Sequence, residues 1–168
     1  VLARPVDCRL ASRAFRKLLT TDTVPTQLRE IPLVHPEIER YGKQLGAIGV
    51  PRLQVDEIIQ CLGDDAWLEA QGLEWFIDLY NYLAGQGWAT SLRLNGLRLL
   101  PVESGERVSA TEQPVYFPNE EAAEAIEEHA EISSAIQLAF LSPDLYALIQ
   151  ESSELRKWLA DVLDVREW

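Results

Sequence analysis

Apolar residues recur at helical spacing along most of the chain and predict several amphipathic helices. The widest apolar face lies over residues 72–84, where Leu73, Phe76, Tyr80 and Leu83 repeat every three or four positions. A face this wide predicts that the helix is central to the core. The same pattern predicts further helices over residues 8–20, 54–62, 143–150 and 153–163.

The sequence also predicts that a helix begins at Pro36, because proline favours the first helical position and acidic residues follow it in the first turn. His35, directly before it, is expected to cap or pack rather than to bind a ligand. Gly46, Gly49 and Pro51 are expected to end this helical stretch.

One region changes from helical to strand-like composition. Residues 92–102 and 107–110 predict two strands around the turn Ser104-Gly105. Pro114 and Pro118 flank residues 115–117, which predicts an edge segment there. A lone hairpin is marginal in water, so it must lean on the helices or on a neighbouring sheet.

These elements predict an α+β fold that is mainly helical, with one small β-hairpin or short antiparallel sheet. We expect a basic N-terminal helix and linker over residues 1–30. A helical unit over 31–140 would carry the hairpin at 92–117, and C-terminal helices would occupy 141–168.

Two stretches of the chain resemble one another. LVHPEIERYGKQLGAIGV (33–50) and FLSPDLYALIQESSELRKWLADVLDV (140–165) share an apolar residue, any residue, proline, an acid and an aliphatic residue. Their prolines, Pro36 and Pro143, lie 107 residues apart. Chance or a copied unit of slightly more than 100 residues would explain the match. A copied unit, like the absence of methionine, favours a segment of a longer array in which 141–168 opens the next repeat.

The composition of the chain argues against nucleic-acid binding and against membrane insertion. The formal net charge of −12 argues against nucleic-acid binding, which needs clustered Lys and Arg. No apolar run approaches the ~20 residues of a membrane span, so we expect no membrane insertion. Cys8 and Cys61 lie outside any metal or redox motif, and two such cysteines fit a reducing, cytoplasmic setting.

A basic cluster near the N-terminus runs against the overall charge. It consists of Arg9, Arg13, Arg16 and Lys17. These side chains are expected either to be solvated or to meet the acidic body, and alternatively to form a docking face for an acidic partner. A transit peptide is a third interpretation. We take the four residues as the candidate interaction residues.

A second charged segment is acidic. Asn119 is expected to cap a helix over 119–131 that carries six glutamates. A solvated face, turned toward neighbours or partners, is the preferred interpretation. A cation site is the alternative, although no Asp-rich loop accompanies these residues.

Motifs with assignable chemistry are missing from the sequence. There is no HExxH, GxSxG or GxxxxGK[ST] pattern, and neither His35 nor His129 has a partner at metal-ligand spacing. GQGWAT (85–90) lacks the third glycine of a dinucleotide fingerprint. We therefore expect no catalytic, cofactor-binding or metal-binding residue in this chain, and no cofactor.

The hairpin region carries a family resemblance. LRLLPVESGERVSATEQPVYFP (97–118), the preceding WLEAQGLEWFIDLYNYL (67–83) and the phrase from His35 to Val50 resemble sacsin-like proteins. They are similar also to the plant NO VEIN type and to large bacterial proteins with a histidine-kinase/Hsp90-like ATPase module. The resemblance covers residues 31–165. It implies a region downstream of the ATPase domain in a protein with chaperone-like or defence-related roles, and it carries no catalytic residue onto this chain.

Three functions remain open from the sequence. The first is a non-catalytic scaffold or interaction segment of a large sacsin-like protein that binds ATP elsewhere. The second is a stand-alone acidic adaptor that binds a protein partner. The third is a small enzyme that uses unpaired carboxylates. Expected partners are proteins or neighbouring domains of the same chain.

Overall fold

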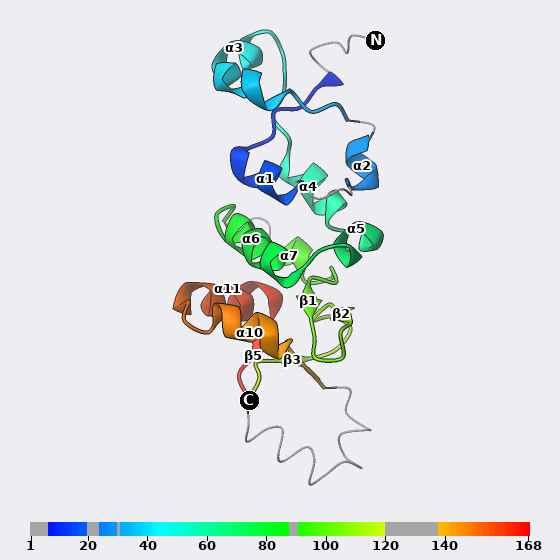
Figure 1. Ribbon diagram of the computed structural model, residues 1–168, viewed down its shortest axis with the longest axis vertical. Helices are drawn as coiled ribbons and strands as arrows, with labels where there is room; N and C mark the ends of the chain where they lie inside the picture. The colour runs from blue at the N-terminus through cyan, green and yellow to red at the C-terminus, as the bar shows by residue number, and fades with distance from the viewer. Residues whose placement is uncertain (1–6, 20–23, 30, 88–90, 120–137) are drawn as a thin grey trace. The chain divides into compact units, whose positions relative to one another are not determined.

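The computed structural model describes residues 7–19, 24–29, 31–87, 91–119 and 138–168 (Figure 1). Its contacts divide the chain into two compact units, residues 1–71 and 72–168, which we call unit 1 and unit 2. The segment boundaries expected after residues 30 and 140 both fall inside these units.

Unit 1 consists of short helices. They are α1 (Arg13–Leu18), α2 (Thr26–Arg29), the 3-10 helix η2 (Pro36–Tyr41), α3 (Gly42–Ala47), α4 (Val55–Cys61) and α5 (Asp65–Glu69). Local capping explains where they begin. The Ser12 hydroxyl accepts from an α1 amide, and the His35 Nδ1 accepts from the Glu37 amide at 3.3 Å, as expected for a cap. Asp64 accepts from the amides of Thr26 and Trp67, which fixes α5 beside α2. These two bonds, that from Thr26 most, lower the pKa of the Asp64 carboxyl.

Three extended segments of unit 1 lie side by side. Arg9 forms a parallel bridge to Leu33, and Leu10 forms one to Arg52, so residues 9–10 lie between two later segments. A small core of Leu10, Val34 and Val50 forms beneath them. The sequence predicted helix from residue 8, whereas α1 begins at Arg13. The backbone of 9–10 is extended because it pairs on both sides.

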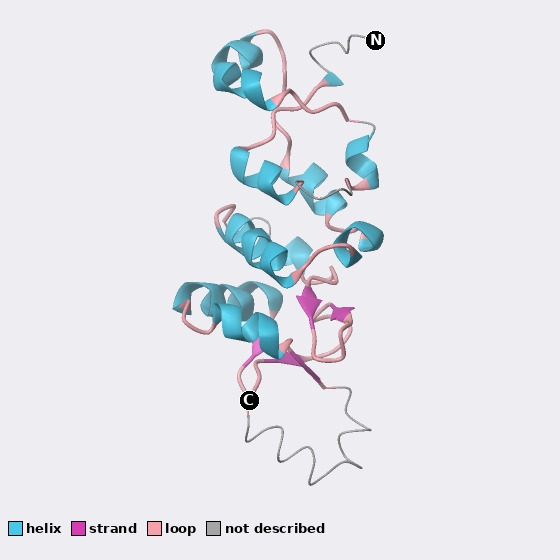
Figure 2. Cartoon of the chain, in the orientation of Figure 1, coloured by secondary structure: helices cyan, strands magenta, loops and turns pink. Residues whose placement is uncertain are grey.

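Unit 2 combines longer helices with short strands (Figure 2). Its helices are α6 (Leu73–Ala84), α7 (Ser91–Leu94), α10 (Pro143–Ile149) and α11 (Ser153–Leu163). α6 packs against α10 and α11, and α7 packs against α11. The Tyr80 ring lies 5.9 Å from the Trp158 ring and is fully buried, which confirms the central place predicted for this helix.

The strands of unit 2 form two small sheets. β1 (Leu100–Pro101) and β2 (Arg107–Val108) make an antiparallel hairpin. β3 (Val115–Tyr116), β4 (Ala139–Phe140) and β5 (Val165–Arg166) make a parallel sheet in the order β4-β3-β5. The structure thus confirms the α+β, mainly helical class with a small antiparallel hairpin. The sequence did not predict the parallel sheet.

The hairpin leans on both kinds of neighbour within unit 2. The buried Tyr80 hydroxyl donates to the Leu99 carbonyl at 2.7 Å, which ties α6 to the start of β1. Val102 forms an antiparallel bridge to Leu141, just beyond β4. Helix and sheet together therefore supply the support that an isolated hairpin lacks.

Two local predictions in this region were wrong. Residues 92–94 belong to α7 rather than to a strand, because alternating leucines over three residues fit either structure. The segment 115–117 is the centre of the parallel sheet rather than an edge. Pro114 and Pro118 flank the paired residues, so neither removes an amide that the ladder needs.

The two units repeat one hydrogen-bonding arrangement. In unit 1 the Val34 amide donates to the Arg9 carbonyl at 3.0 Å, and in unit 2 the Leu141 amide donates to the Tyr116 carbonyl at 2.8 Å. Each residue of the first pair lies 107 positions before its counterpart, as Pro36 does before Pro143.

The other side of each central strand matches as well. The Leu10 amide donates to the Pro51 carbonyl, and the Phe117 amide donates to the Arg166 carbonyl, both at 2.9 Å. In both units the first strand lies between a second and a third strand, both parallel to it. These shared bonds support the copied-unit interpretation of the two similar stretches.

A residue shortly before the third extended segment has the same unusual backbone in both units. Gly49 has a φ of 91° and Asp164 a φ of 53°, and each directly precedes a buried valine, Val50 or Val165. The left-handed conformation ends the preceding helical segment and turns the chain back into the sheet. Glycine adopts it freely, whereas another residue is strained there by about 1–2 kcal/mol.

Gly49→Ala is expected to destabilise unit 1 by about 1 kcal/mol, because alanine resists the left-handed conformation. Gly46→Ala, three residues earlier in α3, should stabilise by about 0.5 kcal/mol, since a Cβ there meets no atom within 4 Å. Hydrogen exchange of the Val34 and Leu53 amides under native conditions would measure both effects. Equal signs for the two variants would contradict the left-handed turn.

Tyr80→Phe is expected to destabilise unit 2 by about 1–2 kcal/mol, because the buried Leu99 carbonyl loses its donor. Exchange of the Leu141 amide would report this change. Tyr41→Phe is the matched control, since the Tyr41 side chain is exposed. An equal, near-zero effect of both changes would show that the hydroxyl does not hold the hairpin.

Candidate interaction surface

Arg9 is held inside unit 1 rather than presented to solvent. Its Nε donates to Glu57 Oε1 of α4 at 2.9 Å, and its Nη1 donates to the Cys8 carbonyl at 3.2 Å. Both carboxylate and guanidinium are part-buried. The residue therefore ties the central extended segment to α4.

Arg16 plays a similar internal part from α1. Its guanidinium lies 2.6 Å from Glu39 Oε1 of η2, and it also donates to the Val34 carbonyl. The pair is part-buried, so solvent screens it less than a surface ion pair. Arg16 thus joins α1 to both the second extended segment and the helix that follows it.

Arg13 and Lys17 are the two members of the predicted set whose side chains are exposed. They lie four residues apart on α1 and so share one face of that helix. The structure therefore divides the four candidate residues into an internal pair and an outward pair. An electrostatic docking face on α1 would consist of Arg13 and Lys17.

An apolar surface follows on η2 and α3, and the sequence reasoning did not identify it. Ile38, Tyr41 and Ile48 are exposed there. Neither helix contributes a buried residue. Because the Arg16–Glu39 pair holds η2 to α1, the exposed apolar residues and the outward basic pair belong to one part of unit 1. Periodicity identifies Ile38 and Ile48 only as apolar residues and does not predict that they are exposed.

The predicted acidic helix over 119–131 lies outside the described residues, apart from Asn119. Its cation-binding and partner-facing interpretations stay predictions.

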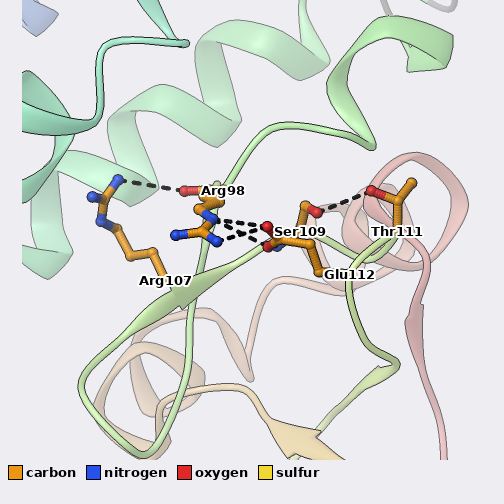
Figure 3. A network of polar contacts seen from close by, with 5 residues as sticks. All are labelled: Arg98, Arg107, Ser109, Thr111 and Glu112. Atoms are coloured by element: carbon orange, nitrogen blue, oxygen red, sulfur yellow. Dashed lines mark hydrogen bonds and ion pairs between the residues drawn. The ribbon is translucent and has the colours of Figure 1, made fainter. Parts of the chain in front are cut away.

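A polar network closes the hairpin of unit 2 (Figure 3). Arg98 holds Glu112 through its Nε and Nη2, at 2.9 and 2.8 Å from Oε1, and Glu112 also accepts from the Ser109 amide. Both bonds lower the pKa of Glu112, the arginine contributing most. The buried Ser109 hydroxyl lies 3.0 Å from the Thr111 hydroxyl. The ion pair thus joins the segments before and after the hairpin, and the hydrogen bond from the Ser109 amide holds Glu112 in place.

The cysteines are free thiols. Burial, with smaller contributions from Asp64 and Glu57, raises the pKa of Cys61 to about 12. A thiol that stays protonated is a poor nucleophile and a poor metal ligand. Cys61 therefore acts as a small apolar core residue.

The described ranges contain neither a cluster of metal-binding side chains nor a candidate membrane span. Within them, no group of three or more His, Cys, Asp and Glu side chains is placed to hold a metal ion. None of the described helices has the length and apolar character to cross a membrane. Comparisons with protein-family models, with curated proteins and with solved structures found no match.

Arg16→Ala is expected to destabilise unit 1 by about 1–3 kcal/mol, because it leaves Glu39 and the Val34 carbonyl without their donor. Arg13→Ala, on the same helix but exposed, should change stability by less than about 0.5 kcal/mol. Exchange of the Leu53 amide would compare the two. Equal costs would contradict the division into internal and outward residues.

Proposed function

We propose that this chain is a non-catalytic scaffold and interaction segment of a large sacsin-like, ATPase-containing protein with a chaperone-like or defence-related role. The duplicated three-strand arrangement carries the proposal, because it supports an array built from repeats. The motifs on which the resemblance rests have structural roles in this chain. The residues around Pro36 begin a helix, and the turn at Gly105 closes the hairpin.

The proposed partners are proteins or neighbouring domains of the same polypeptide. The exposed Arg13 and Lys17 on α1 offer an electrostatic contact for an acidic segment. We extend the proposal to a cytoplasmic location, which the two free thiols support. ATP binding is assigned to a different part of the parent protein.

The size of the native polypeptide tests the proposal. An antibody raised against this chain should detect, in a lysate of the source organism, a band far above 19.0 kDa. A band near 19.0 kDa would reject the segment and make the stand-alone acidic adaptor the function to pursue. Detection after addition of the purified chain to the same lysate controls for the migration of the 19.0 kDa species.

A further inference from the structure

The two copies of the three-strand arrangement differ in what covers them. In unit 2, α10 and α11 connect the second strand to the third, and α6 packs on both of them. Leu145 in α10 is 0% exposed and Leu163 in α11 is 2% exposed. The apolar residues of these connecting helices are therefore part of the core of unit 2.

Equivalent apolar residues of unit 1 lie in solvent. Ile38 follows Pro36 by two residues, as Leu145 follows Pro143, yet Ile38 is 45% exposed.

The same contrast holds at the far end of the connection. Ile48 directly precedes the left-handed Gly49, as Leu163 precedes the left-handed Asp164. Ile48 is 63% exposed. Exposure of two isoleucines at positions that the other copy buries is the first sign of an unfilled interface.

An internal comparison shows that the contrast is specific to these positions. Tyr41 and Leu148 also occupy equivalent places, five residues after their prolines, and both are exposed. The two copies therefore agree on which side of the connecting helix faces solvent. They differ at Ile38 and Ile48, whose counterparts lie in α10 and α11, the helices against which α6 packs in unit 2.

The backbone edge gives a second, independent sign. In unit 2 the hairpin pairs with the end of β4: the Glu103 amide donates to the Phe140 carbonyl at 3.0 Å, and the Ser142 amide donates to the Pro101 carbonyl at 2.9 Å. The hairpin thus extends the parallel sheet on the side of its second strand.

The matching groups of unit 1 are the Leu33 carbonyl and the His35 amide. Among the described residues, neither takes part in a hydrogen bond. The Val34 amide between them points the other way, to Arg9. Within the described part of unit 1, this strand edge is therefore open where unit 2 holds its hairpin.

We infer that unit 1 is a docking site for a helix–helix–hairpin segment of the same kind as residues 72–110. The hairpin would pair with the edge at Leu33 and His35, and the helices would cover Ile38 and Ile48. The natural source of this segment, a preceding repeat of the same polypeptide, rests on the proposed function. The fit itself follows from the contacts within unit 2.

An extended chain tests the fit directly. A second copy of residues 72–110 replaces residues 1–3, because residue 110 lies 107 positions after residue 3 and the graft keeps the repeat's register. Docking should slow hydrogen exchange of the His35 amide by at least about tenfold. It should also slow alkylation of the variant Ile48→Cys, read by mass spectrometry of the peptide that carries it.

The matched control is the same graft with Glu103→Pro in the added copy, which removes the amide meant for the Leu33 carbonyl. It should restore much of the exchange at His35. Unchanged exchange and alkylation in the original graft would overturn the inference. Self-association of the unmodified chain would also overturn the inference. In that case the His35 amide would already exchange slowly and would lose this protection on dilution, because a second copy of the chain would fill the edge. Neither outcome of the graft experiment depends on the size of the native polypeptide. The docking inference and the proposed function are therefore tested independently.

Discussion

The architecture of both units depends on an extended segment that precedes, along the chain, the two segments with which it pairs on either side. Backbone hydrogen bonds on both flanks define its place. On one side the Val34 amide donates to the Arg9 carbonyl in unit 1, and the Leu141 amide donates to the Tyr116 carbonyl in unit 2. Parallel pairing requires a crossover between strands. Short helices lie in the crossovers of unit 1, and α10 and α11 lie in the crossover from β4 to β5 in unit 2. The helices, their caps and the left-handed residue before the third strand all serve this pairing.

Because the pairing is made by the backbone, the side chains of the central strand differ freely between the copies. Arg9 turns to Glu57 and forms an ion pair. Its counterpart Tyr116 instead lies 6.2 Å from the ring of Phe140 and 5.5 Å from that of Trp168. One backbone position thus supports an electrostatic contact in unit 1 and an aromatic cluster in unit 2.

This division between backbone and side chain explains how much the sequence could predict. Helical periodicity, the proline at position 36 and the Ser104-Gly105 turn are local signals, and the helices and hairpin they predict are present. Strands of two residues are too short to alternate, so the parallel sheet left no pattern to read.

The candidate interaction residues show a similar limit of prediction from the sequence, because partners that are distant along the chain leave no local pattern. Arg9 and Arg16 have their partners 48 and 23 residues away, and no local signal separates them from the exposed Arg13. What the sequence did contain was the similarity between two stretches 107 residues apart. That similarity is what relates the exposed isoleucines of unit 1 to buried residues of unit 2.

The order of the strands has a consequence for synthesis on the ribosome. The central strand emerges first, at residues 9–10 in unit 1, while its flanking partners follow only at residues 33 and 52. Translation proceeds at about 5–20 residues per second, so both edges of the nascent strand stay open for seconds. A strand of two residues is too short to template aggregation in that interval. The short length of the central strand therefore protects the chain while the flanking segments are still being synthesised.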